Sequence, residues 1–349
     1  MRRIILLTGG HSDPGRAKTA VNLIRYQSAE IAGVLDKAHA GHTTQSLFGL
    51  GGPIPVAATF DALPPADTVV IGIAPSGGQL PATLREQVLE AISLGMNVIS
   101  GLHQFLSEDP EIAAHAALHG VLIQDVRKTV ERDVANRFGI NEHCLRIHTV
   151  GQDCNVGKMV VSVEITNALQ ERGHDAQFVA TGQTGIMIQG SGCPIDAVAS
   201  DFVSGAAEKL VLANQQHSIL LIEGQGSIAH PRYSAVTLGL LHGCAPDGLI
   251  LCYEMGRKHV AGMQGIALKS LCEYRSLYET MANLMHPCRV IGIAMNSRQH
   301  PLDEAEAERQ RLKDQLGLPV CDVLRHGAHD LVQAVLLRGR EVGKIRPPV

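Results

Sequence analysis

The residues with the clearest chemical meaning lie near the middle of the chain, where Gly-Gln-Asp-Cys-Asn-Val-Gly-Lys occupies positions 151–158. The flanking patterns predict a strand at residues 145–150 and a helix at 158–170. A strand, a tight loop and a helix in this order point backbone N–H groups and the positive end of the helix dipole at an anion. Lys158 adds a cation that reaches phosphate oxygens. We therefore predict a phosphate-binding loop, with contacts from Gly151, Asp153, Cys154, Asn155, Val156, Gly157, Lys158 and Met159.

The loop departs in two ways from the usual pattern Gly-x-x-x-x-Gly-Lys-Ser/Thr. Gly151 lies one position further from the Gly-Lys pair, and Met159 replaces the hydroxyl that normally holds Mg²⁺. A thioether is a poor ligand for a hard cation. The sequence therefore supports phosphate binding better than Mg-dependent ATP hydrolysis. A pyrophosphate-bearing ligand that needs no metal, such as coenzyme A, suits the loop equally well. The alternative interpretation is a turn with a purely structural role.

Two residues further along the chain have the types that proton transfer needs. Glu223 follows a predicted strand at residues 218–222 and begins a glycine loop, and His230 lies seven positions later. A histidine titrates near neutral pH, so His230 is a candidate general base, and Glu223 is the other candidate. The structural alternatives are a Glu223 that caps a neighbouring helix and a His230 that is merely packed or exposed.

A polar, glycine-rich segment at residues 180–186 follows another predicted strand, residues 176–180. Small residues and hydroxyl groups at the carboxyl end of a strand allow close contact with a ligand. An ordinary tight turn is the alternative interpretation. The candidate ligand contacts in this segment are Thr181, Gln183 and Thr184.

Cys154 and Asp201 each have both a chemical and a structural interpretation. Cys154 lies among backbone amides and beside Lys158, which favour a thiolate, so a covalent acyl-cysteine is one hypothesis. The favoured interpretation of Cys154 is a small residue packed beneath the loop. Asp201 either caps a helix or reaches the site as a metal ligand, and the cap is slightly favoured.

A parallel sheet is needed to bring these segments together. Strands and helices alternate along both halves of the chain, which predicts an α/β fold with two parallel-sheet domains covered by helices on both faces. The charged segment 127–144 lacks strand character and is predicted to be a helical connector. We therefore place the domains at residues 1–145 and 146–349. The predicted strands are residues 4–8, 31–35, 54–58, 68–74, 97–101, 121–126, 145–150, 176–180, 218–222, 248–252, 289–296 and 319–323.

The composition excludes several classes of protein. Among 349 residues the net charge is -4, aromatic residues make up 3% and Trp is absent, so neither a nucleic-acid groove nor a base-stacking platform is expected. The eight cysteines form no Cys-x-x-Cys motif, which argues against zinc and against a secreted disulfide framework. No apolar run is long enough to span a membrane. We expect a cytoplasmic protein. A homo-oligomer is expected only on the general ground that the chain is rich in apolar residues and has few charges.

The spacing Gly-x-Asp-x-x-Val-Gly-Lys resembles that of dethiobiotin synthetase and the related cobyrinate amidotransferases. Residues 219–227, a strand followed by Glu-Gly-Gln-Gly-Ser, are similar to the Glu-Gly-Ala-Gly loop of the same group. This resemblance implies that Glu223 lies beside the phosphates. It also implies that, if a metal is used, Glu223 and Asp201 are its candidate ligands.

Further segments, taken together and in order, resemble a single family. This family was long described as a domain of unknown function, has a Rossmann-like first half and a P-loop second half, and includes a D-glutamate N-acetyltransferase. The resemblance implies a Rossmann-like domain before the P-loop domain. It also implies acetyl transfer from acetyl-CoA to the amino group of an acidic amino acid. The segments are residues 150–159, 180–186, 200–208, 222–231, 238–243 and 246–254.

This implied activity fits the candidate residues. The loop would hold the diphosphate of coenzyme A, and Glu223 or His230 would take the proton of the attacking ammonium. An arginine is expected to bind the substrate carboxylates, and Arg232 and Arg257 are the candidates. Two other functions remain open. One is an ATP- and Mg²⁺-dependent enzyme that phosphorylates a carboxylate, as dethiobiotin synthetase does, and the other is a non-enzymatic nucleotide-binding protein.

Overall fold

Six strands of the first half form one parallel sheet in the order β3-β2-β1-β4-β5-β6. β1, β2 and β4 are buried along their whole length, because helices leave neither face of this part of the sheet open to water. The strands are β1 (Ile4–Leu7), β2 (Ile31–Leu35), β3 (Val56–Ala57), β4 (Thr68–Ile71), β5 (Asn97–Ser100) and β6 (Ile123–Asp125). The helices are α1 (Lys18–Gln27), α2 (Thr44–Phe48), α3 (Ala82–Ser93) and α4 (Pro110–His119).

The second half contains another parallel sheet of six strands, in the order β14-β13-β10-β7-β9-β8. A short antiparallel hairpin, β11 with β12, lies outside it. The strands are β7 (Leu145–Gly151), β8 (Ala176–Val179), β9 (Ile219–Ile222), β10 (Gly248–Glu254), β11 (His259–Val260), β12 (Met263–Ala267), β13 (Arg289–Asn296) and β14 (Val320–Cys321). The helices are α5 (Lys158–Gln170), α6 (Gln183–Gln189), α7 (Val203–Asn214), α8 (Ser234–Cys244), α9 (Leu271–Ala282), α10 (Leu302–Leu316) and α11 (His329–Glu341).

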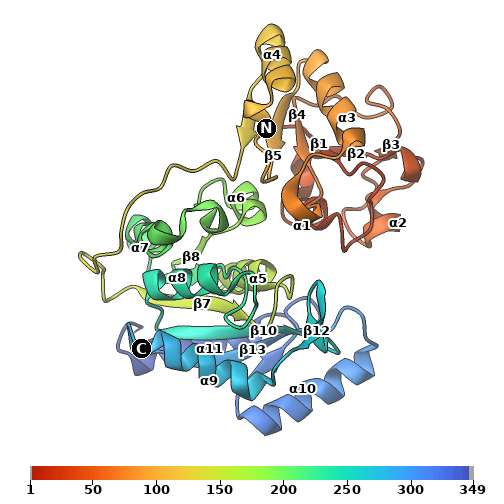
Figure 1. Cartoon of the computed structure of the whole chain (residues 1–349). Coiled ribbons are helices and arrows are strands. Elements are labelled where there is room, and N and C mark those ends of the chain that lie inside the picture. Colours follow the sequence, from red (N-terminus) through yellow and green to blue (C-terminus); the bar gives the residue numbers. More distant parts are fainter. Residues whose placement is uncertain (1, 346–349) are drawn as a thin grey trace. The chain divides into compact units, whose positions relative to one another are not determined.

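The central strand β10 shows why the second sheet is buried on both faces. Its residues alternate between two apolar clusters, with Leu249 and Leu251 in one and Ile250 and Cys252 in the other. The second of these clusters also contains residues of α5 and α11, whereas α9 and part of α8 contribute to the first. Figure 1 shows these four helices around the second sheet. The predicted α/β fold with two parallel sheets is therefore confirmed. No helix among the described residues is long and apolar enough to cross a membrane.

The structure, a computed structural model, describes residues 2–345, so the outer limits of the predicted domains, residues 1 and 349, lie outside it. By its contacts the chain divides into two units. One unit runs to Thr129 and includes Ile186–Gly190, and the other comprises Val130–Gly185 and the chain from Ser191 onward. Residues 130–144, which the sequence analysis placed in the first domain, group with the second unit.

The helical connector predicted for residues 127–144 is wrong, because this segment contains no helix. Part of its backbone bonds to a neighbouring side chain instead of forming helical hydrogen bonds. The N–H groups of Asn136 and Arg137 donate to the two carboxylate oxygens of Glu208 on α7, at 3.0 and 2.9 Å. Arg137 also has a φ of 62°, which a right-handed helix excludes. The segment is thus fixed by α7 rather than by helical hydrogen bonds.

A buried charge cluster fixes the amino ends of β7 and β10. Asp247, just before β10, accepts hydrogen bonds from the backbone of Arg146 at 2.8 Å, from His286 at 2.8 Å and from Lys344 at 2.9 Å. Arg146 is fully buried, and its guanidinium also donates to the carbonyl of Ala245. This cluster lies at the end of the sheet opposite the loop that follows β7.

Asp247→Ala is expected to destabilise the second unit. The change leaves Arg146 and Lys344 buried without their shared carboxylate, and removing one partner of a buried ion pair costs about 3–5 kcal/mol. Urea unfolding of the full chain measures the loss. Asp314→Ala on exposed α10 is the matched control and should change the unfolding free energy by less than about 0.5 kcal/mol. Equal effects of the two changes would contradict a structural role for the cluster.

Candidate active site

The loop between β7 and α5 presents a row of unused backbone donors. Gly157 precedes the helix with a φ of 103°, and no side chain caps the helix start. The N–H groups of Val156, Gly157, Lys158 and Met159 donate to no described residue. Backbone N–H groups at a helix start, together with the helix dipole, bind anions. The local geometry is therefore that of the predicted anion-binding loop.

Lys158 places its ammonium group inside this loop. Its side chain is 7% exposed, and Nζ donates to the carbonyl oxygen of Asp153 at 2.9 Å. Burial lowers the pKa of Lys158, and the carboxylates of Asp153 and Glu223 act in the opposite direction. The side chain passes close to Gly224, where a Cβ atom would lie 2.9 Å from Lys158 Cδ and 1.8 Å from the carbonyl oxygen of Thr149. Only glycine at 224 leaves room for this path.

The Asp153 carboxylate joins the loop to the segment that leads into the β11–β12 hairpin. Its Oδ1 accepts from the N–H of Cys154 at 2.7 Å, and its Oδ2 accepts from Arg257 at 2.9 Å and from the N–H of Ala261 at 2.7 Å. Arg257 also donates to the carbonyl of Cys154 and to Glu254. Arg257 is therefore engaged in holding the loop, whereas Arg232, the other candidate carboxylate ligand, is exposed.

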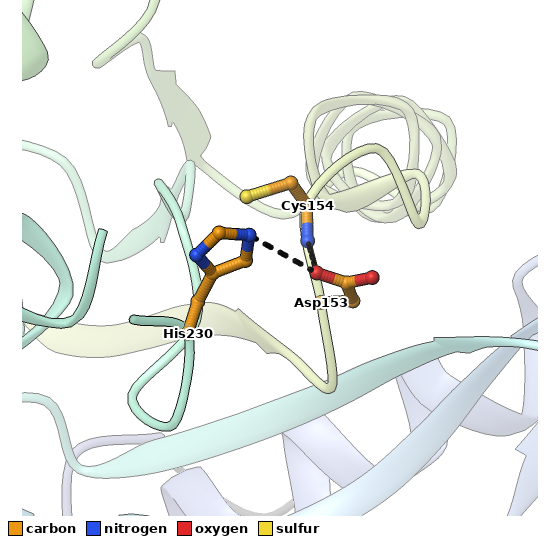
Figure 2. Close-up of side chains that lie close together, drawn as sticks. All are labelled: Asp153, Cys154 and His230. Carbon is orange, nitrogen blue, oxygen red and sulfur yellow. Dashed lines mark hydrogen bonds and ion pairs between the residues drawn. The ribbon is translucent and has the colours of Figure 1, made fainter. Parts of the chain in front are cut away.

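The side chains of Asp153, Cys154 and His230 lie close together (Figure 2). Their potential ligand atoms are within 4.8 Å of one another, the arrangement of a metal site. The hydrogen bonds oppose that interpretation. His230 Nδ1 accepts from the N–H of Arg232 at 3.1 Å, so the neutral ring carries its proton on Nε2, 3.8 Å from Asp153. An Nε2 that carries a proton offers no lone pair to a metal or to a substrate proton.

Glu223 follows β9 and is held by the segment after β8. Its Oε2 accepts from the N–H groups of Thr181 and Gly182, at 2.9 and 3.1 Å. Its Oε1 accepts no hydrogen bond from a described residue, although the side chain is only 5% exposed. Burial raises the pKa of Glu223 to about 7, against the two amides and Lys158, which lower it. A carboxyl group with this pKa accepts and returns protons near neutral pH.

The remaining predicted contacts differ in their surroundings. Thr181, Gln183 and Thr184 are buried at the turn into α6, and Thr181 Oγ1 donates to the carbonyl of Glu223 at 2.8 Å. Asn155 is exposed with a φ of 57°, and Val156 packs into the core beneath the loop. Asp201 is exposed in the 3-10 helix Ser200–Phe202, whereas Glu223 is buried.

Sequence reasoning missed Tyr278 and Ser227, which hold the start of the loop. The hydroxyl of Tyr278 on α9 donates to the carbonyl of Gly151 at 2.8 Å and accepts from the N–H of Ile228 at 3.0 Å. Ser227 Oγ donates to the carbonyl of Gln152 at 3.0 Å. Tyr274 and Tyr278 share one face of α9, but this spacing is typical of any packed helix and indicates no site.

Gly185→Ala is expected to displace the carboxyl group of Glu223. A Cβ atom at position 185 would lie 2.4 Å from Glu223 Oε2, the oxygen that accepts both backbone hydrogen bonds. Overpacking of this kind costs about 1–3 kcal/mol, measured as unfolding free energy in urea. Gly265→Ala on exposed β12, where nothing lies within 4 Å, is the control and should be neutral. A neutral Gly185→Ala would mean that Glu223 is not confined.

Comparison with known proteins agrees with this architecture. Residues 132–332 match the P-loop domain of the DUF1611 family, described as a domain of unknown function, and residues 37–129 match its Rossmann-like N-terminal domain. The predicted Rossmann-like and P-loop halves are thereby confirmed. A crystal structure of a DUF1611 family protein from Anabaena variabilis superposes with a TM-score of 0.91 at 34% identity, covering 97% of this chain and 100% of that one.

Two relatives with curated names are similar over most of the chain. The D-glutamate N-acetyltransferase of Tritonibacter scottomollicae is 39% identical over 272 residues, which is 77% of this chain and 81% of the relative. The D-glutamate N-acetyltransferase of a Pseudoalteromonas species is 38% identical over 268 residues, which is 76% and 80% of the two chains. From its two matching domains and these relatives, the chain belongs to the DUF1611 family.

Proposed function

We propose that this protein transfers an acetyl group from acetyl-CoA to the amino group of D-glutamate or a closely related acidic amino acid. The names of the two relatives support an N-acetyltransferase reaction on D-glutamate. The observation that carries the proposal is Glu223, a buried carboxyl group whose pKa is raised by burial and lowered in part by the ammonium of Lys158 in the loop. The site thus combines a base with donors for an anion.

The reaction requires that the substrate ammonium lose a proton before nitrogen attacks the thioester carbonyl. In this proposal Glu223 takes that proton through Oε1, because Oε2 is occupied by the N–H groups of Thr181 and Gly182. The C–N bond then forms, the C–S bond breaks, and coenzyme A leaves as its thiol after it gains a proton. Glu223 is preferred to His230 as the base, since Nδ1 of His230 is engaged and its Nε2 carries the proton.

The ATP- and Mg²⁺-dependent alternative is less well supported by the residues present. Met159 leaves the start of α5 without the hydroxyl that usually binds Mg²⁺. Asp201, the other expected metal ligand, is exposed, while Glu223 is buried. A non-enzymatic nucleotide-binding protein would have no need for a carboxyl group with a pKa near neutrality. Acetyl transfer needs no hydroxyl for Mg²⁺, and it uses a carboxyl group whose pKa is near neutrality. It therefore fits both features.

The proposal also covers the location of the protein in the cell and its oligomeric state. The protein would act in the cytoplasm, where coenzyme A thioesters are formed, and as a homo-oligomer. Large apolar side chains that are exposed in the single chain support the second point, among them Val130 at 85% and Phe138 at 83%. Such side chains are common at subunit contacts.

Acetyl transfer is tested by following thiol release from acetyl-CoA with the purified protein. Release is expected with D-glutamate and at much lower rates with L-glutamate and neutral amino acids. The product should be N-acetylglutamate by mass spectrometry. Thiol release that does not depend on any amino acid, or no release at all, would overturn the proposed function.

Glu223→Gln should lower kcat by about 10²–10⁴-fold, the usual contribution of a general base, with KM changed far less. In the wild type, kcat/KM should rise with pH through about 7 as Glu223 loses its proton, and this limb should vanish in the variant. Glu171→Gln at the exposed end of α5 is the control and should keep both the rate and the pH limb. A Glu223→Gln enzyme with wild-type kcat would remove Glu223 from the mechanism.

A further inference from the structure

We infer that the loop at residues 151–158 binds a carboxylate of the amino-acid substrate, and not the diphosphate of coenzyme A. This inference rests on the proposed acetyl transfer and goes beyond it, because it assigns the loop to the acceptor instead of the donor. It concerns the same four N–H groups, of Val156 to Met159, and the ammonium of Lys158.

The first argument is the closeness of the base to the anion donors. The side chain of Lys158 runs past Gly224, the residue next to Glu223, and the two side chains influence each other's charge. Oε1 of Glu223 is the unused oxygen of an almost fully buried carboxyl group. A general base must lie within hydrogen-bond reach of the proton it removes, about 2.6–3.2 Å between heavy atoms. The reacting amine is therefore beside the loop.

The second argument is the length of each substrate. In glutamate the amine is one carbon atom from one carboxylate and three from the other. Its amine can therefore meet Glu223 while a carboxylate occupies the loop. In acetyl-CoA the long pantetheine arm separates the diphosphate from the thioester. A diphosphate in the loop would hold the acetyl group far from an amine at Glu223 unless the arm folded back on itself.

The third argument is charge. Among the side chains of the loop and its anchor, Arg257 is already paired with Asp153 and Glu254, which leaves Lys158 as the cation for a ligand. The single negative charge of a carboxylate balances the single positive charge of Lys158. A diphosphate would add more negative charge beside Glu223, and a nearby like charge favours the protonated acid. It would thus disable the base that the transfer needs, and Met159 provides no hydroxyl for a compensating metal.

The test on the wild-type protein uses glutarate, which carries the two carboxylates of D-glutamate without its amine, as the anion probe. Glutarate should bind the protein saturated with coenzyme A as tightly as the free protein, within about threefold. Mutually exclusive binding of glutarate and coenzyme A would overturn the inference. A wild-type protein without acetyl transfer would instead refute the proposed function, so the two failures are distinguishable.

Lys158→Ala provides an independent measurement by calorimetry with each ligand alone. The dissociation constant for D-glutamate should rise about 10- to 100-fold, as expected for loss of a charged hydrogen-bond donor, while that for coenzyme A changes less than about threefold. Lys37→Ala, at an exposed lysine of the first unit, should change neither constant. Weaker binding of coenzyme A with unchanged D-glutamate binding would contradict the inference.

Discussion

Lys158 and Glu223 meet because β7 and β9 are parallel neighbours in one sheet. Leu145 pairs with Ile219 and His148 with Ile222, so both strands run in register towards the same edge. The segments that follow them leave the sheet at the same edge, and the side chain of Lys158 passes close to Gly224, the residue next to Glu223. The hydrogen bond from the N–H of Gly224 to Thr149 Oγ1, at 3.1 Å, ties the two segments at the point where they diverge. The geometry of the site thus follows from strand order.

Burial of two opposite charges near each other gives this edge its chemical character. Burial disfavours the charged form of each group, so it lowers the pKa of Lys158 and raises that of Glu223. The hydrogen bonds from the N–H groups of Thr181 and Gly182 lower the pKa of Glu223, so this carboxyl group can still ionise near neutral pH. An anion bound by the loop would favour the charged form of Lys158 and so raise its pKa. In the proposed reaction, ligand binding and proton transfer would therefore be electrostatically linked.

Local patterns in the sequence predicted the strands of both six-stranded sheets, the loop and the places of Glu223 and Lys158, because each depends on a short run of residues, but they missed the β11–β12 hairpin. Long-range contacts were not predictable in this way. Asp153 and Arg257 meet only because β7 and β10, the strands that precede them, are neighbours in the sheet. Nothing in the sequence of either segment indicates the other. The charged segment 127–144 suggested a helix, but the decisive partner, Glu208, lies on a helix that comes later in the chain.

The Asp153, Cys154 and His230 group shows why hydrogen-bond direction matters more than residue type. By type, the three residues suit either a metal or an activated thiol. By geometry, Asp153 is already saturated by Arg257, Ala261 and Cys154, and the N–H of Arg232 fixes the His230 tautomer. These bonds hold the loop, while the N–H groups from Val156 to Met159 donate to no described residue. Under the proposed anion binding, such a loop would not have to become ordered first, since these contacts already meet the cost of ordering.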